Sequence, residues 1–166
     1  AAGAPLDARD CTRLNRLLRG WPAGLRIATR HHDLMEKRDW NGLAVQFAPY
    51  LAPLFEDRHP DAHRFLMHSS VAPKLNDELV RLLGEEECGV AILEDLHRRG
   101  LFVDHSNDGR DWYRVHPAVR AVYRQYLDGW EPARASELHR VTARYYEAQG
   151  MVAEAIDQFL AAGTDR

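Results

Sequence analysis

The sequence predicts a mainly α-helical fold that contains a single β-hairpin. Apolar residues recur at helical spacing through most of the chain, as at Leu14, Leu17 and Leu18, and glycine or proline separates these stretches. Strand-like runs occur at 101–103 and 112–115, with an Asn-Asp-Gly turn signal between them. One hairpin among helices is therefore the expected architecture.

The composition is that of an ordinary globular protein. With 166 residues, of which 45% are hydrophobic and 28% charged, the chain has room for a sizeable core. Its net charge of −3 creates no overall attraction to nucleic acid or to an anionic membrane. Two cysteines are too few for a disulfide scaffold, and no leader or long apolar run is present. We expect a cytoplasmic protein without a membrane span.

The first segment, residues 1–45, is predicted to be helical. Two short helices should lie between Leu6 and Arg30, interrupted at 20–22, because proline ends a helix from within but suits the first turn of the next one. A polar helical turn at 34–40 should be bounded by Asn41-Gly42. A further helix is expected within Val45 to Phe55, with its start set by Pro49 or Pro53.

The second segment, residues 46–128, has the element order of a winged-helix domain. One helix starts at Pro60-Asp61, a second has Asn76 as its N-cap, and a third runs from 85 to 99 and stops at Gly100. The hairpin follows these three helices, and a fourth helix is expected at 118–127.

The third segment, 129–166, contains two amphipathic helices resembling a tetratricopeptide-like hairpin. Such hairpins stack in sets of about three or more, so we expect the sequence to be a piece of a longer chain.

The second strand of the hairpin predicts which side chains face the core. Because side chains alternate along a strand, Tyr113 and Val115 should face inward. Trp112, Arg114 and His116 should then point outward.

His116 is the candidate functional residue of this hairpin. Pro117 disfavours the α conformation for the preceding residue, so His116 should be held extended where the strand meets the next helix. An imidazole fixed at such a junction is suited to contact a ligand.

Six motifs carry a resemblance to a known family. From Gly20 onward, the chain resembles the large ATP-binding, MalT-like transcriptional regulators of the LuxR type, which belong to the signal-transduction ATPases with numerous domains (STAND). The motifs occur in the family's order, at 20–26, 64–71, 93–103, 112–117, 138–140 and 145–150. The resemblance implies that 1–45 ends a helical domain, 46–128 is the winged helix, and 129–166 begins a helical arm.

The resemblance also implies a nucleotide site. In the wider family, a Gly-x-Pro motif lines the adenine pocket, and a histidine at the end of the hairpin reaches the β-phosphate of ADP in the resting state. These roles fall on Pro22 and His116, with Trp21 and Arg114 as further candidate nucleotide contacts. Pro117 replaces the aspartate that follows this histidine in plant relatives, so the contacts of that aspartate do not carry over.

The resemblance predicts a non-catalytic regulatory module. Its expected partners are the P-loop ATPase domain and the superhelical sensor domain of the same longer chain, with ADP or ATP as the cofactor of that chain. No Gly-x-x-x-x-Gly-Lys-Ser/Thr loop occurs in these residues, so the module itself should neither hydrolyse ATP nor bind nucleotide tightly.

Two alternatives stay open at this level. A winged helix can bind DNA, but the recognition helix would be 85–99, and its leading end carries three glutamates, which disfavours contact with DNA. The arginines at 110, 114, 120 and 124 are expected to pair with carboxylates or to line a domain interface. A stand-alone helical adaptor is the other alternative.

A metal site at His59 and His63 is disfavoured because their spacing lacks a third ligand.

Overall fold

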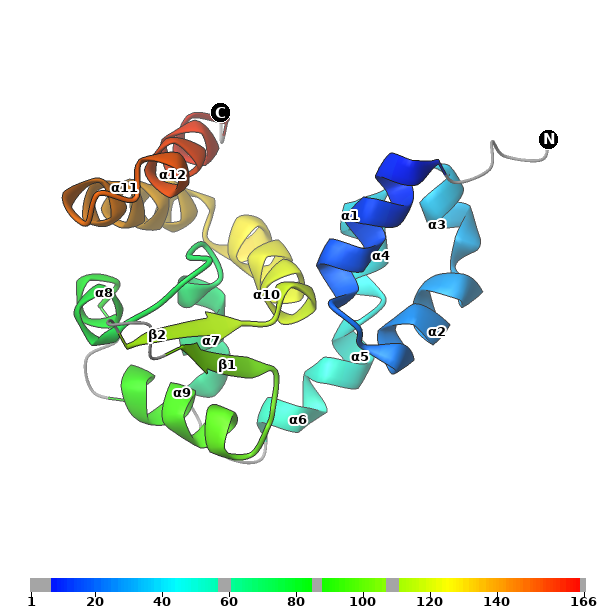
Figure 1. Cartoon of the computed structure of the whole chain (residues 1–166), viewed down its shortest axis with the longest axis horizontal. Helices are drawn as coiled ribbons and strands as arrows, with labels where there is room; N and C mark the ends of the chain where they lie inside the picture. The colour runs from blue at the N-terminus through cyan, green and yellow to red at the C-terminus, as the bar shows by residue number, and fades with distance from the viewer. Residues whose placement is uncertain (1–6, 57–60, 85–87, 107–110, 165–166) are drawn as a thin grey trace.

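A computed structural model of the chain describes residues 7–56, 61–84, 88–106 and 111–164. Three groups of elements follow one another along the chain (Figure 1). Helices α1 to α6 form one side of the molecule, α7 to α10 and the hairpin form the other side, and α11 and α12 lie over this second group, at the upper left of Figure 1. Long helix α10 lies between the first group and the hairpin, where it contacts α1, α4 and α7.

The first group is interrupted where the sequence predicts. Helix α1 spans Ala8–Leu18, and α2 spans Pro22–Arg30, with Pro22 in its first turn. Asp7 and Asp10 form a capping box at the start of α1, each side chain accepting from the other's backbone N–H. The predicted break at 20–22 is therefore confirmed.

The rest of this group differs from the predicted elements. It contains α3 (His32–Glu36), α4 (Trp40–Val45), α5 (Ala48–Leu51) and α6 (Pro53–Glu56). The prediction that Asn41-Gly42 bounds a turn is wrong, because Asp39 caps α4 by accepting from Gly42 N–H and so places both residues inside the helix. The single helix predicted from Val45 to Phe55 is divided in two before Pro53.

The middle group is a winged helix. It consists of α7 (Ala62–Ser69), α8 (Asp77–Leu82), α9 (Gly89–Arg98), β1 (Val103–Ser106), β2 (Trp112–Val115) and α10 (Pro117–Trp130). The strands pair antiparallel with Val103 opposite Val115. Leu75 adds a further bridge by exchanging two backbone hydrogen bonds with Tyr113, of 2.8 and 2.7 Å.

Helix α8 begins where the sequence predicts. Asn76 is the N-cap of α8, since its side chain accepts from Leu79 N–H at 3.0 Å, as the sequence indicates. Helix α9 starts at Gly89, and the predicted start at 85 lies outside the described residues. The predicted turn at 107–109 also lies outside the described residues.

The last group is a pair of packed helices, α11 (Pro132–Ala148) and α12 (Val152–Thr164). It is bonded to the winged helix through buried polar groups. Tyr146 Oη donates to Lys74 O at 2.6 Å and accepts from Lys74 N–H at 3.1 Å, while Gln158 Nε2 donates to Val71 O at 2.9 Å. These bonds hold α11 and α12 against the segment before α8.

One hydrophobic core runs through all three groups. Its largest fully buried side chains include Phe47, Phe65, Tyr123 and Tyr146, which come from all three groups.

Within the described ranges, none of the helices combines the length and apolar character that a membrane crossing requires.

Candidate functional site

His116 is the N-cap of α10 and has the extended conformation that Pro117 predicts, with φ −55° and ψ 136°. Ala118 N–H donates to its Nδ1 at 3.2 Å, which requires that Nδ1 carry no proton. The ring proton is therefore on Nε2, which donates to Leu18 O at 3.0 Å, at the last residue of α1. His116 thus links the winged helix to the helical segment.

The imidazole is enclosed by aromatic rings. Phe102 and Trp21 meet it edge to face, with ring centroids 5.3 and 6.4 Å away. Burial lowers the pKa of His116 below its usual value of 6.5, although the hydrogen bond to Leu18 O acts in the opposite direction. The side chain is consequently neutral at physiological pH.

The prediction of an outward face on β2 is wrong for Trp112 and only partly right for His116. Trp112 is 6% exposed because Tyr145 and Tyr146 of α11 pack against its ring, at 6.4 Å in each case. His116 is half-buried because α1 and the residues that follow it cover that end of the strand. Alternation is preserved, but both faces of the strand are covered.

Three of the four candidate residues line one cavity. Trp21, Pro22 and His116 lie around a volume of about 390 Å³, whose other lining residues are Arg19, Gly20, Gly100, Phe102, Val103 and Asp104. Trp21 is fixed by edge-to-face contacts with Phe47 and Phe102, each at 5.4 Å. The structure therefore brings the Gly-x-Pro motif and the hairpin histidine together, although they lie far apart in the sequence.

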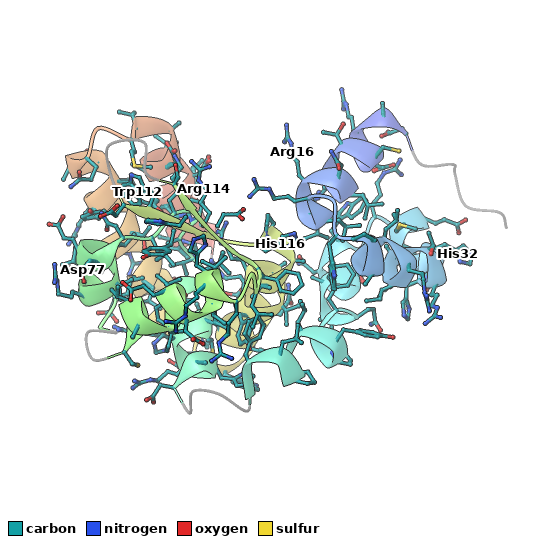
Figure 2. The ribbon with its side chains drawn as sticks, turned by 60° about the horizontal axis from the view of Figure 1, so that its bottom comes forward. Arg16, His32, Asp77, Trp112, Arg114 and His116 are labelled. Atoms are coloured by element: carbon teal, nitrogen blue, oxygen red, sulfur yellow. The ribbon has the colours of Figure 1, made fainter. Side chains whose placement is uncertain are left out.

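Arg114 faces a different cavity. This second volume, about 620 Å³, is lined by Arg16, Arg19, Lys74, Arg114 and Arg120, with Asn15, Pro73, Val115 and Pro117. Figure 2 shows Arg16 on α1 and Arg114 on β2, with His116 further along toward α10. Arg19 lines both cavities. The sequence predicted Arg114 but not its grouping with Arg16, Arg19 and Lys74.

The cations at the end of α9 have carboxylate partners. Asp95 lies 2.7 Å from Arg98 and 2.8 Å from Arg99, and hydrogen bonds from these two arginines lower the pKa of its carboxyl. Arg124 pairs similarly with Asp128 at 2.6 Å. In the part of the chain that the structure describes, no group of three or more His, Cys, Asp or Glu side chains is arranged to hold a metal ion.

The fold and the two cavities define a winged-helix module joined on one side to a helical segment and on the other to a helical pair. Residues 51–136 match the MalT winged helix domain family. The chain belongs to this family, which is a winged-helix domain rather than a catalytic one.

Two relatives illustrate the similarity. The HTH-type transcriptional regulator MalT of Klebsiella pneumoniae (strain 342) is 32% identical over 169 residues, and that of Yersinia pestis (strain Pestoides F) is 33% identical over the same length. Each alignment covers 96% of this chain, whereas the chain spans only 19% of the length of each relative.

Proposed function

We propose that this chain is a regulatory module of an ATP/ADP-switched transcriptional regulator. It packs on a P-loop ATPase domain and contributes Pro22 and His116 to the ADP site of the resting state. The observation that carries the proposal is the common cavity of Trp21, Pro22 and His116. The relatives described above are named as transcriptional regulators, which supports the same reading.

The hydrogen bonds of His116 suit it to exchange one acceptor for another. Ala118 N–H keeps the proton on Nε2, so the ring presents a donor. Leu18 O, which now accepts from Nε2, also accepts from Trp21 N–H at 2.7 Å. A phosphate oxygen that took over the imidazole N–H would therefore leave Leu18 O with a partner, and the exchange would orphan no buried carbonyl.

A hydrogen bond from Nε2 to a charged phosphate contributes about 1.5–3 kcal/mol, against about 0.5–1.5 kcal/mol for the bond to Leu18 O that it replaces. The net gain of about 1–1.5 kcal/mol biases a two-state equilibrium by roughly tenfold. Arg19 at the edge of the cavity adds a cation that favours an anionic ligand, since its own ion pair with Asp104 is long, at 3.9 Å, and exposed.

The C-terminal helix supports packing on a further helical domain, the proposed superhelical sensor. Four large apolar side chains of α12 are exposed: Val152, Ile156, Phe159 and Leu160. Their spacing places them on one face of the helix. A helical neighbour stacked on α12 would remove this face from water.

Substitution of His116 in the longer regulator tests the proposal. His116→Ala should reduce the ADP that copurifies with the protein and raise basal transcription, because the resting state loses a contact. His116→Gln, which retains an N–H donor, should restore part of the ADP retention. His32→Ala, on α3 and exposed, is the matched control. Unchanged ADP content together with unchanged basal transcription in His116→Ala would contradict the proposal.

The alternatives make different predictions. Direct DNA binding draws no support from α9, since Arg98 and Arg99 are both paired with Asp95. Salt-sensitive micromolar binding to random duplex in an anisotropy titration would favour it nonetheless. A P-loop in the coding sequence upstream of Ala1 would support the regulator, and a start codon there without one would support the stand-alone adaptor.

A further inference from the structure

The cavity that contains Arg114 is unusually basic. Five of its nine lining residues are cationic: Arg16, Arg19, Lys74, Arg114 and Arg120. None of the lining residues carries a carboxylate. The cations come from α1, from the segment before α8, from β2 and from α10, so four separate parts of the fold bring positive charge to one place.

Only part of this charge is compensated. Lys74 is paired with Glu154 at 2.9 Å, and Arg19 lies 3.9 Å from the exposed carboxylate of Asp104. Within the described ranges, no carboxylate lies within ion-pair distance of Arg16, Arg114 or Arg120. Three guanidinium groups around one volume therefore repel each other without a counter-charge.

Arg114 and Arg120 also have incomplete hydrogen bonding. Arg120 donates only to the neutral backbone oxygens of Ser70, at 3.1 Å, and Val71, at 3.4 Å, although a guanidinium carries five N–H donors. Burial lowers its pKa to about 10, which means that its surroundings disfavour the charged form. The Nε of Arg114 is buried and has no partner in the described structure. Buried donors and unpaired charges of this kind are costly unless a ligand satisfies them.

We propose that this cavity binds a phosphate-bearing small molecule between Arg16, Arg114 and Arg120, as a site separate from the one lined by Pro22 and His116. Arginine forks match the oxygens of a phosphate group in paired hydrogen bonds. The volume of about 620 Å³ lies within the range of small-molecule sites. Convergence of the cations from several elements around a hollow favours a compact polyanion over an extended acidic peptide or duplex.

A ligand in this site would join the helical segment to the winged helix. Arg16 belongs to α1 of the helical segment, whereas Arg114 and Arg120 belong to the winged helix. A phosphate group bridging them neutralises repulsion across the boundary between the two. The bound ligand therefore holds α1 against β2 and α10. The phosphate is supplied by a free phosphorylated small molecule. A nucleotide that extends from the neighbouring cavity past Arg19 is the competing arrangement, and the test distinguishes the two.

Thermal unfolding of the chain and ³¹P NMR provide the test, with inorganic phosphate, pyrophosphate and ADP as probes and sodium chloride at equal ionic strength as the reference. Phosphate and pyrophosphate should raise the melting temperature saturably above the chloride reference. Arg16→Gln should weaken this binding by about tenfold or more. Arg16 is exposed, so its substitution leaves the fold intact, and Arg114→Gln should act in the same direction. Arg26→Gln, an exposed arginine on α2, is the charge-matched control and should bind as the unsubstituted chain does.

The effect of His116→Ala separates a free phosphorylated ligand in its own site from a nucleotide that spans both cavities. Saturable phosphate binding that persists in His116→Ala, while Arg16→Gln loses it, supports a separate site. If ADP is the only probe that binds, and His116→Ala and Arg16→Gln weaken it equally, the two cavities form one nucleotide site and the separate site is refuted. A melting temperature that phosphate raises no more than chloride does, or raises equally in Arg16→Gln, also overturns the proposal.

Discussion

The pH dependence of the His116 link is the sharpest test of the geometry in the chain itself. At pH 7.5, His116→Ala removes the cap on Ala118 N–H, worth about 1 kcal/mol, and the bond to Leu18 O, worth about 0.5–1.5 kcal/mol. It also removes the edge-to-face contacts with Phe102 and Trp21, worth about 0.5–1.5 kcal/mol together. The substitution should therefore lower the free energy of unfolding by about 2–4 kcal/mol.

The cost should be smaller at pH 5.5. The folded pKa of His116 is lowered, so the unfolded chain binds the proton more readily than the folded one. The contribution of His116 to the free energy of unfolding is therefore complete above about pH 6.5 and is lost as the pH falls below that value. At pH 5.5 the wild-type chain has therefore lost part of the stability that the alanine variant lacks at every pH.

Urea unfolding followed by circular dichroism at the two pH values measures the difference directly. Comparing the variant with the wild type at each pH cancels the contributions of the other histidines. His32→Ala on α3 should give a negligible cost at both values, since that side chain is exposed. An equal or larger cost of His116→Ala at pH 5.5 would refute the neutral, Nε2-protonated histidine inferred here.

Two further substitutions test the packing around the site. Tyr146→Phe leaves both backbone groups of Lys74 without their partner and should lower the free energy of unfolding by about 1–3 kcal/mol in chemical denaturation. A cost near zero would show that this hydroxyl does not fix α11 against the segment before α8. Gly89→Ala places a methyl group 2.5 Å from Val80 Cγ1 and 2.9 Å from Phe65 Cε2, so it should cost about 1–3 kcal/mol through overpacking. An unchanged melting temperature would show that α9 shifts freely.

Local signals in the sequence predicted the elements that depend on neighbouring residues. Pro22 in the first turn of α2 and Asn76 as the cap of α8 act within one helical turn, so the sequence alone identifies them. The turn predicted at Asn41-Gly42 is wrong for an equally local reason. The dipeptide favours turns, but the Asp39 side chain three residues before Gly42 caps a helix that contains it.

The environment of the candidate site depends on contacts that no local pattern contains. Alternation along β2 separates two faces but does not say how many of them are covered, and α11 covers the one that holds Trp112. The acceptor of His116 is a backbone carbonyl of α1, a group that every residue carries and no sequence motif marks. The basic cavity gathers arginines from helices and a strand far apart in the chain, which is why the sequence grouped Arg114 with Arg120 but not with Arg16, Arg19 or Lys74.

The two cavities meet at the end of α1, so the proposed ADP contact and the proposed phosphate site share one turn of backbone. Arg19 ends the helix in the left-handed conformation, with φ 40° and ψ 43°, which costs a non-glycine residue about 1–2 kcal/mol. Its N–H is bonded to Asn15 O at 2.7 Å, its side chain lines both cavities, and the carbonyl before it accepts from His116. A ligand that displaces His116 from Leu18 O and a phosphate held by Arg16 therefore act on the same turn of backbone. Occupation of either cavity should consequently change the affinity of the other, and by linkage the coupling is equal in both directions.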